Sequence, residues 1–486
     1  MSANGDAELV FQPARGLIGL MTSRQLSARE LLDAHLQQIE KVNPQVNALV
    51  TVCADRACEL AAAADAALAK GRVLGPLHGL PAAHKDLADT AGIRTTYGSP
   101  LHADHVPTRN HLVVQRMLDA GCVTLGKTNT PEFGTGSQTY NPVFGATANA
   151  YDPAKTCGGS SGGAAVALAT GMAAVCDGSD MAGSLRNPAS WNNVVGLRPS
   201  DGRVPQWPND RPVFTLSVYG PMGRTVGDVA LQMLVMARPS NRSILNLPPQ
   251  DFHAVYDGDM TGTPVAWSDT LDGLPIDPAL AEALAPARGL LTQLGCAVTD
   301  AEPDLTGVDE AFDIMRAAYY WQEHAQEYRD RPDQLGDSVR WEIEHGSRLT
   351  VEDLGRAETL RARAYDRMHD FLDTYRFLVA PVTQLPPFPI EQHWPETVAG
   401  VPQTYYREWM RVCSRISLTG NPAVSVPFGF TADGLPAGLQ IIGRHGDDLG
   451  VLQLAQAVES ATGTWRTRPA RPVVGRDHRP PPAVAP

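Results

Sequence analysis

The residues best suited to chemistry lie in one run of small side chains, from Cys157 to Ser200. A Gly/Ser-rich loop comes first, a helix of small residues is expected over 163–171, and the run continues as Asp177-Gly-Ser-Asp-Met-Ala-Gly-Ser184. Such a run is typical of tight backbone packing. It also displays a serine hydroxyl among backbone N–H groups, which a nucleophile and an oxyanion pocket require. The pattern therefore indicates either a closely packed core or a serine that attacks a carbonyl carbon.

Alternating strands and helices must position this run. Short apolar segments predict buried strands at Cys122–Leu125, Ala173–Cys176, Val265–Trp267 and Phe377–Ala380. Apolar residues at helical spacing predict helices over 110–120, 279–294 and 449–458. This alternation is typical of an α/β fold with a largely buried, parallel or mixed sheet.

Two helices are predicted before the first of these strands. Ser27-Ala-Arg-Glu30 is a capping-box pattern that begins a helix, and Asn43-Pro44 is expected to end it. The alanine-rich segment Ala54–Lys70 predicts the second helix, which Gly71 terminates. We expect a helical hairpin over residues 25–71 on the outside of the molecule.

One motif resembles a phosphate-binding loop. Gly121-Cys-Val-Thr-Leu-Gly-Lys127-Thr fits the letter of that pattern, which needs a flexible loop that opens a helix. Val123–Leu125 instead has the composition of a strand, and Asn-Thr-Pro131 interrupts any helix that follows. We therefore predict that Lys127 is a lysine near the end of a strand.

A second motif resembles the nucleophile elbow of α/β-hydrolases. Gly158-Gly-Ser160-Ser-Gly162 fits this pattern, which places a serine on a tight turn between a strand and a helix. No β-branched strand precedes it, since residues 152–157 read Asp-Pro-Ala-Lys-Thr-Cys. The chain has 13 histidines, so an esterase with a Ser-His-Asp triad remains an alternative.

The run of small residues resembles the amidase signature family. Several motifs of that family occur in the right order over roughly residues 12 to 465: Leu77–Asp86, Gly126–Phe133, Gly158–Gly163, Gly178–Arg186, Val195–Pro199, Gly420–Pro427 and Gly434–Gln440. Linked motifs are far more specific than any one of them. The resemblance implies the amidase signature fold, an α/β fold with a large mixed central sheet covered by helices on both faces.

The resemblance also implies a Ser-Ser-Lys triad. By position, Ser184 is the nucleophile, Ser160 is the bridging serine, and Lys85 is the base. The Gly159–Ser160 peptide bond is expected to be cis, as in the family. A lysine can act as a base near neutral pH only where burial lowers its pKa, and the apolar run Leu80–His84 suits such burial.

Roles for the neighbouring residues follow from the same resemblance. The oxyanion hole is expected to consist of the backbone N–H groups of Met181, Ala182 and Gly183, together with that of Ser184. Ala182 stands where the family usually has glycine, so its methyl group is expected to narrow the pocket or to disfavour a positive φ. Ser161, Asp180 and Arg186 are expected to hold the loops through hydrogen bonds and an ion pair. His84, next to Lys85, is expected to be a packed histidine.

Four residues are candidates for substrate contact. Gly134, by its family position, is expected to line the acyl pocket through its backbone. Tyr319, Tyr320 and Trp321 lie in a helical region that varies in the family. These rings would either wall a hydrophobic pocket or belong to the core.

The resemblance predicts a single amidase domain over residues 1–465. Within it we expect the helical hairpin at 25–71, the signature core at about 75–205, and variable helices that shape the substrate pocket at about 300–415. The Pro/Arg-rich tail 466–486 has a composition that favours flexible chain.

Composition limits the possible partners. Forty basic and 53 acidic residues give a net charge of −13, which argues against nucleic acid and anionic membranes as partners. The sequence has neither a leader pattern nor a long apolar run, so we expect a cytoplasmic protein. We also expect a monomer or a homodimer. Seven scattered cysteines without a C-x-x-C pair favour reduced thiols and no structural zinc. No cofactor or metal is expected.

These observations predict a stand-alone serine amidohydrolase that cleaves an apolar amide, anilide or carbamate (urethane), with possible side activity on esters. The resembled family also includes the amidase subunit of the tRNA-dependent amidotransferase, which is the main alternative. Ala182 and the stretch Ser190-Trp-Asn-Asn193 depart from the pattern of that subunit, and nothing in the sequence signals a tRNA partner. The expected partner is therefore a small-molecule substrate.

Overall fold

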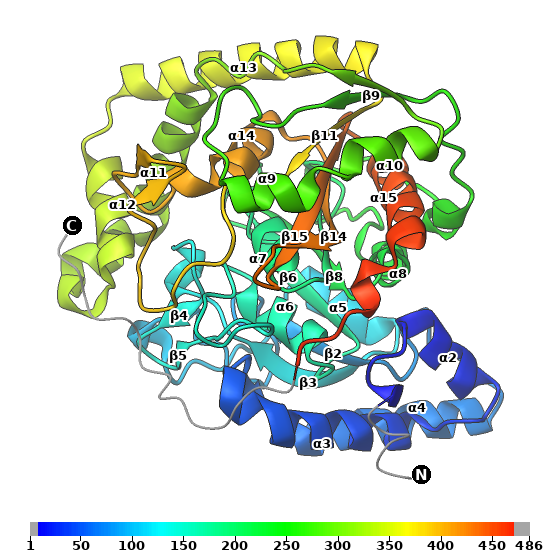
Figure 1. Cartoon of the computed structure of the whole chain (residues 1–486). Coiled ribbons are helices and arrows are strands. Elements are labelled where there is room, and N and C mark those ends of the chain that lie inside the picture. The colour runs from blue at the N-terminus through cyan, green and yellow to red at the C-terminus, as the bar shows by residue number, and fades with distance from the viewer. Residues whose placement is uncertain (1–7, 471–486) are drawn as a thin grey trace.

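Eleven strands form the central sheet of the protein, which a computed structural model describes over residues 8–470 (Figure 1). Neighbouring strands follow the order β1 (Leu49–Val52), β3 (Val123–Thr128), β2 (Pro81–Lys85), β6 (Val175–Asp180), β8 (Val218–Gly223), β7 (Val195–Arg198), β14 (Ala423–Phe430), β15 (Pro436–Gly443), β11 (Phe377–Pro381), β9 (Pro264–Trp267) and β10 (Ala297–Asp300). Two small hairpins lie apart from this sheet: β4 (Tyr140–Asn141) with β5 (Gly145–Ala146), and β12 (Thr397–Val398) with β13 (Val401–Pro402).

The central sheet is mixed. Strand β2 is parallel to both β3 and β6, and β9 is parallel to both β10 and β11. The other neighbouring pairs are antiparallel. The predicted α/β class with a large mixed sheet is therefore confirmed.

The α-helices of the described residues surround this sheet (Figure 1). Their bounds are α2 (Ala14–Thr22), α3 (Ala28–Val46), α4 (Ala54–Ala69), α5 (Leu112–Asp119), α6 (Gly162–Ala169), α7 (Arg186–Trp191), α8 (Val226–Met236), α9 (Pro278–Leu284), α10 (Ala287–Gln293), α11 (Val308–Asp330), α12 (Asp337–Ser347), α13 (Val351–Thr374), α14 (Arg411–Thr419) and α15 (Asp448–Thr462).

Helices cover both faces of the sheet. Gly196 on β7 faces α7, because a Cβ atom there would collide with Ala189. Gly196 is paired with Met222 on β8, and the next residue, Gly223, faces Asp228 of α8. Successive residues of a strand point to opposite faces, so α7 and α8 lie on opposite faces. Helix α6 packs beside α7, and α15 packs beside α8.

The predicted N-terminal hairpin is present with two differences. The Ser27 side chain caps α3 as expected, but the helix passes Pro44 and ends at Val46. A proline removes only one helical hydrogen bond, and the left-handed Asn47 (φ 52°) supplies the end instead. Strand β1 follows α3 and precedes α4 along the chain, and it was not predicted from the sequence. It pairs antiparallel with β3.

Two other predicted elements need correction. The helix expected over 279–294 is two helices, α9 and α10, because Pro286 lies between them. The strand expected at Ala173–Cys176 begins at Val175 and continues to Asp180. The second half of this strand, β6, has the polar sequence Asp177-Gly-Ser-Asp180, which is not typical of a buried strand. All six residues of β6 are nevertheless buried.

Lys127 lies near the end of a strand, as predicted, and its side chain is fully buried. It lies on β3, and its ammonium group donates hydrogen bonds to the Ala88 carbonyl and to Thr90 Oγ1. The backbone around it is a strand rather than a loop that opens a helix, so the phosphate-loop pattern has no structural counterpart here.

Residues 466–470 are the described part of the tail that was predicted to be flexible. Arg468 forms an ion pair of 3.0 Å with Glu8, which ties residues 466–470 to the start of the described chain. The rest of the tail, from residue 471, lies outside the described residues.

Candidate active site

The candidate catalytic residues meet where two parallel strands end. Strands β2 and β6 are neighbours, with Ala82 opposite Val175, so their carboxyl ends lie at the same edge of the sheet. Lys85 is the last residue of β2, and Ser179 is next to last on β6. In open α/β sheets, ligands bind at such an edge.

Two further segments bring serines to this edge. Ser160 and Ser161 immediately precede α6, and Ser184 lies in the turn between β6 and α7. The Ser161 N–H donates to the Ser184 carbonyl at 3.2 Å, which joins the two segments. Small residues are required here, because a Cβ atom on Gly178 would lie 2.7 Å from Ser161 Oγ.

Three serine hydroxyls surround the Lys85 amine. The distances from Lys85 Nζ are 2.7 Å to Ser160 Oγ, 2.9 Å to Ser161 Oγ and 3.1 Å to Ser179 Oγ. The Gly159–Ser160 bond is cis, as the resemblance implied. The structure therefore brings together two of the three predicted triad residues, Lys85 and Ser160.

Lys85 is prepared to lose its proton near neutral pH. Its side chain is fully buried, and this burial lowers the pKa of Lys85 to about 7, although the charges of Asp180 and Asp177 raise it in part. A buried amine favours its neutral form because an unsolvated charge is costly. Near pH 7 a large fraction of Lys85 is thus a neutral amine that can accept a proton.

Ser184 lines the same pocket as Ser160 and Ser179 and is 6% exposed. Its hydroxyl makes no hydrogen bond within residues 8–470, so the predicted contact between Ser160 and Ser184 is absent here. Catalytic hydrogen bonds are often long before a substrate binds and shorten in the substrate complex. The Ser184 hydroxyl thus has no partner among the described residues and lines the pocket.

The turn before Ser184 presents backbone N–H groups. Those of Met181, Ala182 and Ser184 have no hydrogen-bond acceptor among the described residues. The Gly183 N–H, in contrast, donates to Asp180 Oδ1 at 2.9 Å. Three of the four predicted donors are thus open to an oxyanion, whereas Gly183 is engaged in holding the turn.

Ala182 is accommodated without backbone strain. It is not among the non-glycine residues with positive φ, and the positive angle falls on Gly183 instead, at 112°. The Ala182 methyl group packs in a buried apolar cluster that includes Cys413. The expected effect of this methyl group on the backbone is therefore absent.

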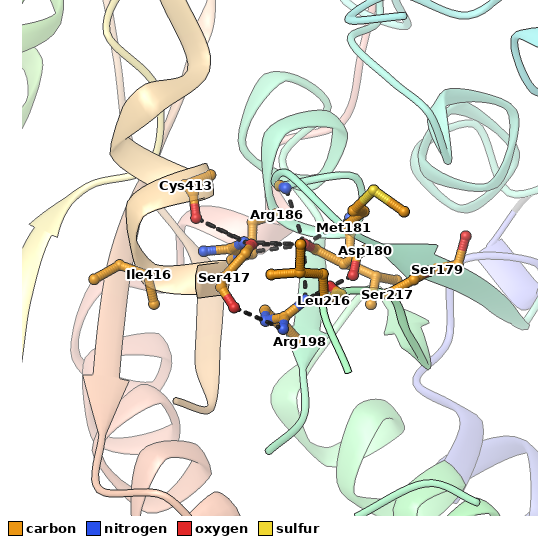
Figure 2. Close-up of polar contacts among 12 residues, drawn as sticks. Ser179, Asp180, Met181, Arg186, Arg198, Leu216, Ser217, Cys413, Ile416 and Ser417 are labelled. Atoms are coloured by element: carbon orange, nitrogen blue, oxygen red, sulfur yellow. Dashed lines mark hydrogen bonds and ion pairs between the residues drawn. The ribbon is translucent and has the colours of Figure 1, made fainter. Parts of the chain in front are cut away.

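Asp180 and Arg186 form a buried ion pair that anchors the turn. Figure 2 shows Arg186 against Asp180, with two N–H···O hydrogen bonds of 3.0 Å. Burial alone would raise the pKa of Asp180, but Arg186 and then Arg198 hold this pKa well below its ordinary value. Arg186 also donates to Ser417 Oγ at 2.7 Å, which ties the turn to α14. The holding role predicted for Asp180 and Arg186 agrees with this geometry.

Ser161 has a similar holding role. Besides Lys85 Nζ, its hydroxyl bonds to both the N–H and the carbonyl of Ser179, each at 3.3 Å. His84 points elsewhere: its Nδ1 lies 2.5 Å from Asp177 Oδ2, and its Nε2 lies 3.1 Å from Thr124 Oγ1. His84 is thus a packed histidine, as predicted.

A pocket of about 570 Å³ opens above Ser184 and Ser160. Gly134 lines it with a positive φ of 72°, and a Cβ atom there would lie 3.6 Å from Ser160 Oγ. Tyr319 and Tyr320 of α11 also line it. Trp321 does not, because it packs against Gly346 of the neighbouring α12.

Aromatic rings form one side of this pocket. Phe214 stacks on Tyr319 with ring centres 4.5 Å apart, and Phe133 lies 4.2 Å from His324. Burial lowers the pKa of His324 to about 4, so this imidazole is neutral at pH 7. An uncharged aromatic wall is suited to a flat apolar group of a ligand.

Charged groups complete the lining, and three of them are in ion pairs. Arg211 forms an ion pair with Glu323, and Arg316 pairs with Glu342 at 2.8 Å. Arg316 also donates to Met181 Sδ at 3.0 Å, beside the row of N–H groups. The pocket is therefore more polar than the sequence analysis expected.

Three residues of the site, Ser179, Phe214 and Arg316, were not predicted from the sequence. Ser179 could have been found, because it lies five residues before Ser184 in the run that was singled out. Phe214 and Arg316 come from distant segments that carry no motif, and only the tertiary fold brings them to the pocket.

Comparison with known proteins decides the family. The model of the Amidase family matches residues 30–452. The chain belongs to this family, the amidase signature family. It is 36% identical over 477 residues to an acylamidase of Rhodococcus erythropolis, and the match covers 96% of this chain and 99% of the relative.

Two other similarities bear on the activity of this amidase. One subunit of the glutamyl-tRNA(Gln) amidotransferase of Dehalococcoides mccartyi is 33% identical over 481 residues, 93% of this chain and 97% of the relative. The crystal structure of a bacterial aryl acylamidase of the same family superposes with a TM-score of 0.87 at 28% identity, covering 95% of this chain and 99% of that one. The predicted family and fold are thus confirmed, and this amidase is a hydrolase of C–N bonds other than peptide bonds.

The nucleophile-elbow alternative finds no support in this fold. Ser160 follows irregular chain rather than a strand, and within the described range no histidine forms a hydrogen bond with Ser160 or Ser184. Burial lowers the pKa of His111, another residue of the pocket, to about 4, which makes it a poor base.

Three further findings concern the cysteines, metal binding and the membrane. All seven cysteines are free thiols. Over residues 8–470, no cluster of three or more His, Cys, Asp or Glu side chains is placed to hold a metal ion. No described helix has the length and apolar character needed to span a membrane.

Proposed function

We propose that this amidase is a stand-alone serine amidohydrolase that forms an acyl-enzyme on Ser184, with Ser160 and Lys85 as the proton relay. The observation that carries the proposal is the 2.7 Å contact between Ser160 Oγ and the fully buried Lys85 amine, whose pKa is lowered to about 7. A serine hydroxyl needs a base to attack an amide, and a neutral amine in contact with a bridging hydroxyl supplies one.

The proposed reaction proceeds in two stages. Ser184 Oγ attacks the amide carbon while its proton passes to Ser160, and Ser160 gives its own proton to Lys85 Nζ. The negative oxygen of the tetrahedral intermediate accepts hydrogen bonds from the N–H groups of Met181, Ala182 and Ser184. The relay then returns a proton to the leaving nitrogen as the C–N bond breaks. Water, activated by the same relay, hydrolyses the ester on Ser184.

We propose an aryl amide as the substrate class. Support comes from the aromatic wall, where Phe214 and Tyr319 stack, and from the similarity to an acylamidase and to an aryl acylamidase. An aryl carbamate has the same carbonyl and the same flat apolar group, so we propose urethane cleavage as a second activity. Next to this wall, the charges of Arg211 and Glu323 neutralise each other in an ion pair.

The main alternative is the amidase subunit of a tRNA-dependent amidotransferase. The 33% identity to the amidotransferase subunit of Dehalococcoides mccartyi keeps this alternative open. A stand-alone hydrolase is favoured because the acylamidase relative is more similar over slightly more of the chain, 96% against 93%.

The test is release of aromatic amine by the purified protein alone. We expect turnover of 4-nitroacetanilide, followed by the absorbance of 4-nitroaniline, and slower turnover of the matched N-(4-nitrophenyl) carbamate. Glutaminase activity that appears only with partner subunits and tRNA, with no turnover of either aryl substrate, would support the alternative instead.

The pH dependence should report the Lys85 amine. Because the relay needs neutral Lys85, kcat/KM is expected to rise with pH, to bend near the pKa of about 7, and to level off above it. The Asp177 charge raises the pKa of Lys85, so Asp177→Asn should move the bend to lower pH. The measurement is kcat/KM for 4-nitroacetanilide from pH 5 to 9 with both proteins. A bend that Asp177→Asn leaves in place would assign the titration to another group.

The aromatic wall should govern binding of the aryl group. Phe214→Ala removes a ring that stacks on Tyr319 and lines the pocket, so kcat/KM for 4-nitroacetanilide should fall about tenfold, mainly through KM. Val213→Ala is the matched control, because the adjacent Val213 is 71% exposed and does not line this pocket. Equal losses in the two variants would contradict the proposed place of the ring.

A further inference from the structure

A second pocket of about 480 Å³ shares a wall with the candidate active site. The segment 132–135 divides the two: Phe133 and Gly134 line the active-site pocket, and their neighbours Glu132 and Thr135 line the second. Tyr406 also lines the second pocket, and its hydroxyl accepts a hydrogen bond of 2.9 Å from Arg316, which lines the first. The two pockets are thus back to back.

Aromatic side chains dominate the second pocket. Trp341 of α12 lies nearly parallel to Tyr405, with ring centres 5.7 Å apart, and meets Tyr406 edge to face at 6.3 Å. Tyr140 and Trp394 line it from two other segments. A concave site with several rings of this kind binds flat apolar groups well.

The charged groups of this pocket are mostly engaged with the protein. Arg340 forms an ion pair with Asp337, and Glu132 accepts hydrogen bonds from Ser99 Oγ at 2.6 Å and from the Gly336 N–H at 2.8 Å. Asp333 at the rim is exposed and disfavours an anion. The lining therefore selects a neutral aromatic molecule.

A buried network connects this pocket to the oxyanion turn. Tyr406 donates a hydrogen bond to Glu342, and Glu342 holds Arg316 at 2.8 Å. Arg316 in turn donates to Met181 Sδ at 3.0 Å, and Met181 carries one of the proposed oxyanion donors. Arg316 is 3% exposed and Glu342 is fully buried. Water therefore cannot replace the hydrogen bonds that these two residues would lose if the Tyr406 hydroxyl moved.

We propose that the second pocket is an effector site for a neutral aromatic molecule, which acts on hydrolysis through Tyr406, Arg316 and Met181. Binding at the site is independent of the catalytic assignment, whereas the effect on rate rests on the proposed function. A ligand that packs against the Tyr406 ring changes the position of its hydroxyl, and through Arg316 the position of Met181 relative to Ser184.

Binding is tested with 2-naphthol, a neutral aromatic probe, by isothermal titration calorimetry. Ser338 lines the pocket on the half-buried side of α12, so Ser338→Trp should fill the site and weaken binding by about tenfold or more. Ser347→Trp adds the same ring to an exposed position of the same helix, outside the pocket, and should leave the affinity unchanged. Absence of binding to the wild type, or unweakened binding to Ser338→Trp, would overturn the proposal.

The effect on rate is tested with 4-nitroacetanilide. Saturating 2-naphthol should change kcat of the wild type by about twofold or more, and Ser338→Trp should remove this response. Tyr406→Phe should still bind 2-naphthol but lose the response, because the link from the ring to Arg316 and Glu342 is gone. An effect on KM alone, of the competitive kind, would show that the probe occupies the active-site pocket and would overturn the effector role.

Discussion

Replacing Lys85 by methionine should lower kcat/KM for an aryl amide by about 10⁴-fold or more, while the protein stays folded. The variant keeps the length of the side chain in its buried position but removes the amine that contacts Ser160 at 2.7 Å. Without this base the proton of Ser184 has no acceptor, and a neutral hydroxyl attacks an amide very slowly. The measurement is the steady-state release of 4-nitroaniline, with circular dichroism to confirm the fold.

A second buried lysine provides the control for this variant. Lys127 lies on the neighbouring strand β3, is also fully buried, and also has a pKa lowered by burial. Its amine contacts Ala88 and Thr90 and none of the three serines. Lys127→Met should therefore cost stability but leave kcat within about threefold of the wild type. Equal losses of activity in both variants would show that the effect of Lys85→Met arises from a buried lysine in general.

Replacing Arg186 by methionine should lower the free energy of unfolding by about 3–5 kcal/mol. The guanidinium is fully buried and donates to both oxygens of Asp180 and to Ser417 (Figure 2). It also donates to Gln440. Its removal leaves the Asp180 carboxylate buried with Arg198 as the remaining ion-pair partner, at 3.5 Å. A buried charge that loses its partner is strongly destabilising. Unfolding in urea, followed by fluorescence, measures the loss.

The comparison variant for Arg186 is Arg356→Met. Arg356 is about half exposed and pairs with Glu310 at 2.7 Å on the surface. Exposed pairs contribute little, so this variant should lose only a small fraction of the stability that Arg186→Met loses. A loss from Arg186→Met that is no larger than the loss from Arg356→Met would contradict the role of the buried pair.

Local patterns in the sequence predicted much of the fold. The Ser27 capping box and the apolar runs gave the positions of α3, β3, β9 and β11 to within a few residues, because these signals are local. Strand β1 was missed because it has only four residues, three of them at least partly exposed. The end of β6 was missed because its polar residues, from Asp177 to Asp180, are buried by tertiary partners such as His84 and Arg186.

The site was predictable to a lesser degree. The family motifs placed Lys85 and the serines in one site, and the structure brings Lys85 to Ser160. The free N–H groups near Ser184 could be predicted, but the engagement of the Gly183 N–H by Asp180 could not, since it depends on how the turn closes. Trp321 was proposed for the pocket together with Tyr319 and Tyr320, yet it packs against α12. A helix turns by about 100° per residue, so Trp321 points to nearly the opposite side from Tyr319.

The central claim is that Ser184 is the nucleophile, and a covalent trap tests it most directly. An O-aryl carbamate should carbamoylate the enzyme, and tandem mass spectrometry of the digested protein should place the added mass on Ser184. The label should be absent from Ser184→Ala and should form slowly in Lys85→Met. A label on Ser160 or Ser161, or full labelling of Ser184→Ala, would contradict the account.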